Sequence, residues 1–299
     1  MRVVVFGGCG FLGSWLTKKL LDKDLEPVIF DKEINKNFLK KISNFSANKI
    51  DFIKGDITNY DHVFAASQKG EVLINLAGLM TPDCSRNPLG GNAVNVVGSI
   101  NVFEAAKKQN NKFVIYTSSG GVFGRNDPET PFPETHYGAF KLAVEGIARA
   151  LFLENNLSSF GLRPFVIYGP GREIGGTAGI TLACKASAYN EDYTIPFSGK
   201  AGFVFVEDVT EIILRLIKQQ PKGANVVNVN GISCQITEII KILSKINKNN
   251  KISYEKNNLP VVGEIIGNSP ENYFKDFVFT CLEKGIMETV NFYKGFNGV

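Results

Sequence analysis

The chain has 299 residues, of which 44% are hydrophobic and 21% are charged, and its formal net charge is +4 at neutral pH. This balance is typical of a soluble globular protein with enough chain to bury a sizeable core. The small positive charge is scattered, which argues against a nucleic-acid partner. No apolar run is long enough to cross a bilayer, so we predict no membrane partner and expect a cytoplasmic protein without a signal peptide.

The cysteines and histidines predict neither a disulfide framework nor a metal site. Five cysteines, an odd number, lie far apart and form no Cys-x-x-Cys pair, which fits a reducing compartment. His62 and His136 are the two histidines, and neither stands with Cys, Asp or Glu at ligand spacing. We place His136 in a loop.

The first part of the chain alternates between apolar runs and amphipathic segments, the pattern of a parallel, doubly wound α/β sheet. A helix that carries Tyr137 is expected to run to about residue 155, with a strand after it at 159–166. Before them, the predicted strands cover 2–6, 27–31, 50–54, 72–76 and 112–118, and the predicted helices 11–22, 36–43, 59–67 and 92–109.

The second part of the chain breaks this alternation. Residues 168–202 are rich in Gly, Pro and Thr, and we interpret them as a loop-rich insertion over the substrate. The run FVFV, a helix at 208–219 and a strand at 226–229 return to the core, and helices near 235–247 and 280–294 complete a smaller domain. The predicted domains are therefore discontinuous, with 1–167 plus about 203–232 in one and about 168–202 plus 233–299 in the other.

A glycine turn lies directly after the first predicted strand. Glycines occur at Gly7, Gly10 and Gly13, and an amphipathic helix follows. The first glycine permits a tight turn, the second lets the backbone approach a pyrophosphate, and the third lets the helix pack closely on the strand. The helix N-terminus then offers free N–H groups to the phosphates. This order predicts a dinucleotide site.

Asp31 ends the second predicted strand, 18 residues after Gly13. An acid at this place hydrogen-bonds the adenosine ribose and repels a 2′-phosphate, which favours NAD over NADP. Lys32 beside it weakens this preference, because a cation accepts such a phosphate. The alternative is that Asp31 only caps a turn.

Tyr137 and Lys141 stand four residues apart in YGAFK, after a predicted strand that ends at Ser118 and Ser119. A free tyrosine has a pKa near ~10 and is a poor base at neutral pH. A lysine at i+4 lies on the same helix face, where its charge favours the phenolate. A serine hydroxyl at the strand end can hold the substrate oxygen against the phenol. The trio therefore indicates proton removal from an alcohol.

Eight segments occur in the order typical of one family. They are GGCGFLG, Asp31, GDI at 55–57, NLAG at 75–78, NVVGS at 95–99, YTSSGGVFG at 116–124, YGAFK at 137–141 and LRPFVIYGPG at 162–171. Together they resemble the extended short-chain dehydrogenase/reductases, which include NAD-dependent nucleotide-sugar epimerases and dehydratases. The resemblance implies a Rossmann-type domain, a smaller C-terminal substrate domain, and NAD as cofactor.

The resemblance also assigns residues. It implies Ser119, Tyr137 and Lys141 as the catalytic residues, with Ser118 structural unless a bulge exchanges the two serines. Substrate contacts are expected from Ser118, Ser119, Arg172 and Thr177. Cofactor contacts are expected from Gly7, Gly10, Phe11, Leu12, Gly13, Asp31, Lys32, Asp56, Ile57, Leu76, Ala77, Gly78, Asn95, Thr117, Tyr137, Lys141, Phe165 and Val166.

Two of these assignments have open alternatives. Asp56 either reads the adenine amino group or caps the helix that begins near Tyr60. Asn95 either matches the asparagine that holds the active-site helix in the family or is an ordinary polar helix residue.

The function that the resemblance implies is redox chemistry at a sugar hydroxyl. Tyr137 removes the proton, Lys141 lowers the tyrosine pKa and binds the nicotinamide ribose, and Ser119 polarises the developing carbonyl. A 4-epimerase of a UDP-glucose-type nucleotide sugar is the first expectation. An NAD-dependent dehydrogenase of a free sugar, polyol or sugar acid is the alternative. A non-catalytic dinucleotide sensor is disfavoured, because both Tyr137 and Lys141 are present.

The substrate segments depart from the family pattern. Nucleotide-sugar enzymes of the family usually carry an arginine before the Phe-Val-x-Val-x-Asp-Val segment, where this chain has Ala201 and Gly202 with Lys200 nearby. The C-terminal stretch VVGEIIGNSPENY offers no second arginine. This lowers the expectation of a diphosphate, which attracts planar bidentate donors. Arg172 either binds an anion or pairs with a carboxylate such as Glu173.

The resemblance further implies a homodimer. Family members commonly pack two helices from each partner into a four-helix bundle, here those near 95–109 and 139–154. Leu142, Ile147 and Leu151 are the expected apolar surface, unless they serve the core of the chain itself.

Overall fold

The structure is a computed structural model that describes residues 1–43, 50–110, 112–259 and 261–295. Residue 260 and residues 296–299, which the sequence analysis assigned to the smaller domain, lie outside this description.

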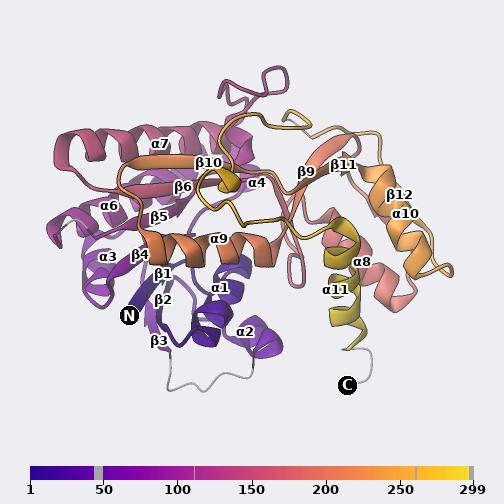
Figure 1. Cartoon of the computed structure of the whole chain (residues 1–299), viewed down its shortest axis with the longest axis horizontal. Helices are drawn as coiled ribbons and strands as arrows, with labels where there is room; N and C mark the ends of the chain where they lie inside the picture. Colours follow the sequence, from indigo (N-terminus) through magenta and orange to yellow (C-terminus); the bar gives the residue numbers. More distant parts are fainter. Residues whose placement is uncertain (44–49, 111, 260, 296–299) are drawn as a thin grey trace.

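A seven-stranded sheet forms the centre of the molecule (Figure 1). All its neighbouring strands pair in parallel, in the order β10-β6-β5-β4-β1-β2-β3. This confirms the predicted Rossmann-type doubly wound sheet. The strands are β1 (Arg2–Phe6), β2 (Glu26–Asp31), β3 (Asp51–Lys54), β4 (Val72–Asn75), β5 (Val114–Thr117), β6 (Ser159–Pro164) and β10 (Ala224–Val229). The order reverses beside β1, where such folds open a crevice at the carboxyl ends of the strands.

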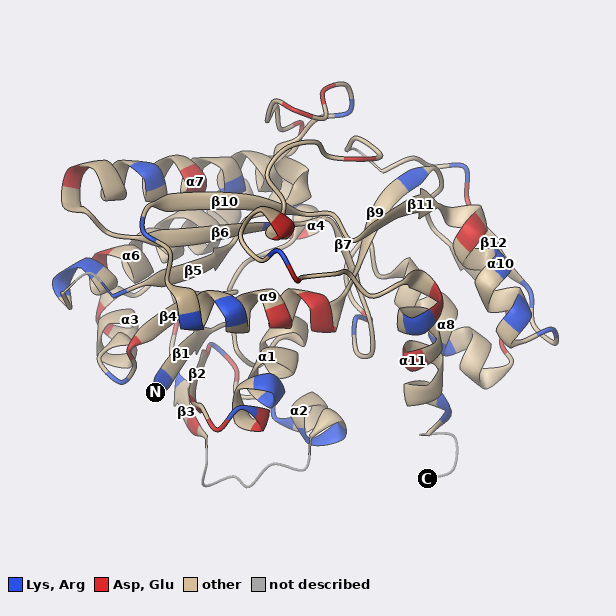
Figure 2. Cartoon of the chain, viewed as in Figure 1, with Lys and Arg blue, Asp and Glu red and all other residues tan. Residues whose placement is uncertain are grey.

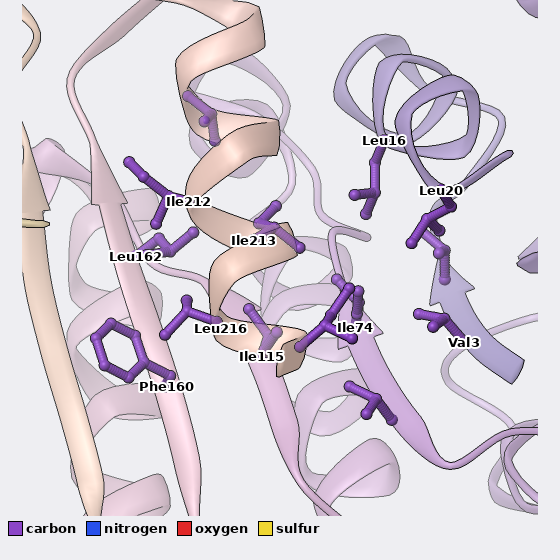
Figure 3. Close-up of a cluster of buried hydrophobic side chains, with 14 of the residues drawn as sticks. Val3, Leu16, Leu20, Ile74, Ile115, Phe160, Leu162, Ile212, Ile213 and Leu216 are labelled. Atoms are coloured by element: carbon purple, nitrogen blue, oxygen red, sulfur yellow. The ribbon is translucent and has the colours of Figure 1, made fainter. Parts of the chain in front are cut away.

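Helices cover both faces of the sheet. Val3 and Val5 of β1 pack into a core with α1 (Phe11–Asp22), α2 (Asn37–Ile42) and α9 (Val206–Gln219), shown in Figure 3. The alternate residues Val4 and Phe6 point to the opposite face, as strand geometry requires. The helices on that face are α3 (Tyr60–Ser67), α6 (Gly98–Lys108) and α7 (His136–Asn155).

A smaller unit lies beside the sheet, at the right of Figure 1. Its three-stranded sheet has the order β11-β9-β7, and its two-stranded sheet pairs β12 with β8. Aromatic and aliphatic side chains such as Tyr168 and Phe203 form its core. The strands are β7 (Val166–Tyr168), β8 (Tyr193–Ile195), β9 (Lys200–Phe205), β11 (Ile232–Gln235) and β12 (Ile252–Tyr254), and the helices α8 (Gly179–Tyr189), α10 (Ile236–Ile246) and α11 (Leu282–Lys294).

The segment 168–202 is more ordered than the sequence predicted. It contains α8, whose buried face includes Ile180 and Cys184, together with β8 and the start of β9. Small residues in GITLACKASAY hide the helical period, which is why a loop was expected. The predicted strand 159–166 is also interrupted at Phe165, between β6 and β7. The run FVFV pairs in the smaller sheet rather than the central one, whereas α9 after it returns to the central core.

The helix predicted at 92–109 is longer and less regular than expected. It starts as α5 (Pro88–Asn92), passes through a π-helical turn η2 (Ala93–Val97) and continues as α6. The helix α4 (Thr81–Arg86) before it was not predicted. Two short 3-10 turns, η3 (Gly120–Val122) and η4 (Pro270–Asn272), complete the fold.

The distribution of charge agrees with the sequence analysis. In Figure 2 basic and acidic segments alternate along the outer helices, without a stripe of one sign in the part of the chain that is coloured. Across the described ranges, no helix is both long and apolar enough to cross a membrane, and no group of three or more His, Cys, Asp or Glu side chains is arranged to hold a metal ion.

A buried ion pair joins α7 to the central sheet. The guanidinium of Arg163 in β6 donates through Nε and Nη2 to the two carboxylate oxygens of Glu145, at 2.8 and 2.6 Å. Glu145 is 7% exposed and Arg163 15%. The Ser118 hydroxyl also donates to Glu145, and Arg163 reaches Asn228 of β10. The pair therefore fixes the helix that carries Tyr137 against three strands.

We predict that Arg163→Met lowers the free energy of unfolding by about 3–5 kcal/mol, because it leaves the Glu145 carboxylate buried without its partner. Arg125→Met is the matched control, since Arg125 makes an exposed pair with Glu134 whose loss costs about 1 kcal/mol or less. Denaturant unfolding of both variants gives the comparison. Equal losses in the two variants would show that the buried pair does not hold α7.

Candidate active site

The crevice beside β1 holds a cavity of about 490 Å³. Its wall gathers residues from the glycine turn, the ends of β4 and β5, the start of α7 and the loop after β7. Sixteen of the residues assigned from the sequence line it, namely Gly7, Gly10, Phe11, Leu12, Gly13, Leu76, Gly78, Thr117, Ser118, Ser119, Tyr137, Lys141, Phe165, Val166, Arg172 and Thr177. The six that do not are Asp31, Lys32, Asp56, Ile57, Ala77 and Asn95.

The glycine turn is shaped to receive a diphosphate. A side chain at Gly13 would place its Cβ 2.5 Å from the carbonyl oxygen of Gly7, so only glycine allows α1 to begin this close to β1. The N-cap of α1 is Gly10, which provides no capping side chain, and the first turn carries no acidic residue. The N–H groups at the start of α1 are therefore left to a ligand, and they suit the phosphates of a dinucleotide.

Asp31 lies at the end of β2 and points back at the glycine turn. Its carboxylate accepts the backbone N–H of Cys9 at 3.0 Å and that of Glu33 at 3.4 Å. Lys32 is largely exposed and its Nζ lies 3.4 Å from Asp56, so its charge is already paired. The Asp31 carboxylate thus stands beside the glycine turn, the position at which an acid would fit a ribose of NAD.

Asp56 does not cap a helix. Its carboxylate accepts the backbone N–H and the hydroxyl of Thr58, and the backbone bond chiefly holds its pKa below the usual range. The cap of α3 is Asn59, which accepts the N–H of His62 at 3.1 Å, so the capping alternative for Asp56 is wrong. Ile57 next to it is a core residue, 6% exposed.

Tyr137, Lys141 and Ser119 meet at one wall of the cavity. Tyr137 is the second residue of α7, whose N-cap Thr135 accepts the N–H of Gly138 at 3.0 Å. His136 begins this helix, so it is not in a loop as expected. Lys141 is 5% exposed and its Nζ donates to the carbonyl of Thr117 at 2.8 Å, 5.7 Å from the centre of the Tyr137 ring. The Ser119 oxygen accepts the N–H of Gly121 at 3.0 Å.

The electrostatics differ from the simple expectation that Lys141 acidifies Tyr137. Burial raises the pKa of Tyr137, while the hydrogen bond with Ser119 and the charge of Arg172 lower it. Burial also lowers the pKa of Lys141 to about 8, partly offset by the nearby Cys84 thiol. Two cations therefore lie near the phenol, Lys141 at 5.7 Å from the ring centre and Arg172 on the loop after β7, and the charge of Arg172 lowers the pKa of Tyr137.

The two serines have different surroundings. Ser118 is 1% exposed and its hydroxyl is committed to Glu145, so the tentative assignment of Ser118 to substrate does not fit its contacts. Ser119 stands beside the ring of Tyr137 instead. Successive residues of an extended segment point in opposite directions, which accounts for the division.

Asn95 does not line the cavity, and its amide ties the π-helical turn to the loop and helix after β4. It is fully buried in the π-helical turn, and its amide donates to the Leu79 carbonyl at 3.1 Å and to the Cys84 sulfur at 3.3 Å. Cys84 in turn donates to the Leu79 carbonyl. The role of this thiol next to Lys141 was not predicted, because the cysteine spacing was interpreted only for metal sites and disulfides.

An apolar wall of the cavity was also missed. It comes from two segments, the loop and helix after β4 and the segment between β12 and η4. Its residues are Met80, Pro82, Leu259 and Val261. The uninterrupted apolar run LPVV was the available signal.

We predict that Lys141 makes the stability of the cofactor-free protein depend on pH. The pKa of about 8 in the folded protein lies below the unfolded value of 10.5, so the unfolded state binds more protons between these values. The free energy of unfolding should therefore rise from pH 8 to pH 10.5 by on the order of 3 kcal/mol. Below pH 8 the folded protein bears the full cost of burying the charged Lys141 ammonium. Lys141→Met should lack this rise in denaturant unfolding; parallel pH profiles for the two proteins would contradict the assignment.

The chain is similar to known proteins over most of its length. A model of the NAD dependent epimerase/dehydratase family matches residues 3–230. The UDP-glucose 4-epimerase of Mycolicibacterium smegmatis is 30% identical over 229 residues, covering 72% of this chain and 72% of that enzyme. The 3 beta-hydroxysteroid dehydrogenase type 7 of Homo sapiens is 31% identical over 192 residues, 57% of this chain and 51% of that enzyme.

The fold is also that of solved structures. The UDP-N-acetylglucosamine 4-epimerase from Methanobrevibacter ruminantium M1, in complex with UDP-N-acetylmuramic acid, has a TM-score of 0.85 at 24% identity and covers 98% of both chains. The glycine cradle and the acid at the end of β2 fit the cofactor that the family description names. The chain belongs to the NAD dependent epimerase/dehydratase family, and NAD is its cofactor.

Proposed function

We propose that the protein oxidises a secondary hydroxyl of a sugar, with Tyr137 as the base, Ser119 as the group that orients the substrate oxygen, and Lys141 as the cation beside them. The observation that carries this proposal is the meeting of these three side chains at the cavity wall, next to the glycine turn. NAD supplies the hydride acceptor when bound.

The residues divide the work as follows. The Tyr137 oxygen takes the proton from the substrate hydroxyl. The electron pair of the broken O–H bond forms the second C–O bond while the hydrogen on the same carbon leaves with its electron pair, as hydride, for the acceptor that NAD would supply. Ser119 donates to the oxygen that is becoming the carbonyl. Lys141 is anchored on the Thr117 carbonyl, which leaves two of its three N–H donors for ribose hydroxyls. General base action of this kind contributes on the order of 10²–10⁴-fold.

The first candidate reaction is 4-epimerisation of a nucleotide sugar of the UDP-glucose type. It is supported by the similarity to the M. smegmatis UDP-glucose 4-epimerase over 72% of both proteins and by the fold shared with a UDP-N-acetylglucosamine 4-epimerase. In such a reaction the hydride returns to the other face of the same carbon, so no reduced cofactor is released.

The second candidate is net dehydrogenation of a free sugar, polyol or sugar acid. It is favoured because this chain has no arginine at the position where the family usually places one to bind a diphosphate. Ala201 there is 2% exposed, and a Cβ on Gly202 would lie 2.4 Å from the carbonyl oxygen of Asn230, so an arginine does not fit. Lys200 pairs with Glu264.

The predicted homodimer stays a proposal, with a changed surface. Leu151 belongs to the core of the chain itself and Ile147 is partly buried against that core, while Leu142 is partly buried against a separate small cluster that includes Val122 and Phe123. Leu89 at 84% and Val97 at 39% exposure are the larger apolar side chains left open along α5 and η2. Together with Leu153 of α7, which is 76% exposed, they are the expected contact.

We predict that Tyr137→Phe lowers turnover at least about 100-fold, because the ring remains while the proton acceptor is lost. The affinity for NADH should stay within about twofold, since the phenol oxygen adds little to dinucleotide binding. Tyr254→Phe, on the exposed strand β12, is the control and should behave as wild type. Turnover that survives in Tyr137→Phe would remove Tyr137 as the base.

We predict that the two candidate reactions can be distinguished by whether NADH accumulates. With UDP-glucose, the first gives UDP-galactose by chromatography and no lasting NADH absorbance. With gluconate or sorbitol and added NAD, the second gives a steady rise of NADH absorbance. If UDP-glucose gives no UDP-galactose, and gluconate and sorbitol give no NADH, the proposed redox function is contradicted.

A further inference from the structure

Arg172 is a cation that lines the cavity and has no acidic partner among the residues that the structure describes. It lies in the loop between β7 and α8, and its side chain lines the cavity together with Thr177. Its Nη1 donates to the Ile174 carbonyl at 2.7 Å, and its guanidinium lies 6.0 Å from the centre of the Phe11 ring. Within the described ranges, no ion pair to a carboxylate is formed by this guanidinium.

The neighbouring acid is already occupied. Glu173, the partner considered from the sequence, instead pairs with Lys185 at 2.6 Å and accepts the Tyr293 hydroxyl at 2.9 Å. Its side chain therefore belongs to the contact between α8 and α11 rather than to the cavity. A guanidinium has five N–H donors, and the Ile174 carbonyl uses one of those of Arg172.

The cavity as a whole is positive. Among its described lining residues there is no Asp or Glu, while Lys141 and Arg172 are both present. Lys141 is anchored on the Thr117 carbonyl deep beside Tyr137. Arg172 is thus a second cation of the cavity with donors left for a ligand, apart from those that Lys141 offers to the cofactor ribose, and burial lowers the pKa of its guanidinium.

The position of Arg172 limits what that anion is. Arg172 and Tyr137 line the same cavity of about 490 Å³, and the charge of Arg172 lowers the pKa of the phenol. The remaining substrate wall is apolar, formed by Met80, Leu259 and Val261. An anion bound to Arg172 would therefore occupy the same cavity as the hydroxyl that Tyr137 deprotonates.

We propose that Arg172 binds a carboxylate of the substrate, so that the enzyme acts on a sugar acid or uronic acid whose carboxylate lies near the oxidised carbon. A planar carboxylate matches the paired N–H groups of a guanidinium, and Thr177 adds a hydroxyl at the same wall. This inference rests on the proposed function and names its substrate class. The carboxylate has two sources, a free sugar acid or the uronic acid of a nucleotide sugar.

The test compares acids with their neutral counterparts on the protein saturated with NADH, where no oxidation proceeds. The pairs are gluconate with sorbitol, glucuronate with glucose, and UDP-glucuronic acid with UDP-glucose. Calorimetric titration should show that at least one acid binds about tenfold or more tightly than its partner. Arg172→Gln should lower the affinity for that acid by about 10- to 100-fold and leave the affinity for its neutral counterpart unchanged. Arg125→Gln, in an exposed ion pair, is the control.

Three results would overturn the inference. They are equal binding of acid and neutral partner, no binding of any acid, and an Arg172→Gln variant that loses NADH affinity instead, which would assign Arg172 to the cofactor phosphates beside Phe11. Unfolding of Arg172→Gln at the wild-type temperature shows that the loop is intact. Tyr137→Phe should bind the acid as wild type does, so failure of the carboxylate site and failure of the proposed base are distinguishable.

Discussion

The hydrogen bond from the Lys141 ammonium to the Thr117 carbonyl is the contact on which the site depends. It joins the first turns of α7 to the end of β5, and so sets Tyr137 beside Ser119 at the edge of the sheet. Burying an ammonium with one backbone acceptor is costly, and the lowered pKa of Lys141 is the expression of that cost. The ribose hydroxyls of a bound cofactor are the groups that would relieve it.

The surrounding structure keeps this costly arrangement in place. One turn along α7, Glu145 accepts hydrogen bonds from Ser118 and Arg163 and so fixes the end of β5 against the helix. On the other flank, Asn95 and Cys84 tie the loop after β4 to the π-helical turn. Rigid neighbours of this kind let a proton acceptor stay in position without a ligand to order it.

The parallel sheet and most of the residues that line the cavity were predictable from sequence, because they follow from local patterns. The glycines of the first turn, the acid at Asp31 and the Tyr137–Lys141 pair each encode one backbone or side-chain requirement. What the sequence did not reveal depends on contacts distant in the chain. Ser119 rather than Ser118 is available to the substrate because the Ser118 hydroxyl donates to Glu145. Arg172 is available to an anion because Glu173 is paired with Lys185 and accepts the Tyr293 hydroxyl. The helix α8 was missed because small residues conceal its period.

A crystal structure of the complex with NAD tests the central claim most directly. The account predicts that the nicotinamide lies in the cavity with its reactive ring carbon within roughly 5 Å of the Tyr137 hydroxyl, leaving space for one substrate carbon and its oxygen. Lys141 should keep its bond to the Thr117 carbonyl and reach the adjacent ribose. A nicotinamide bound away from Tyr137, or a phenol turned into the protein interior, would contradict the account.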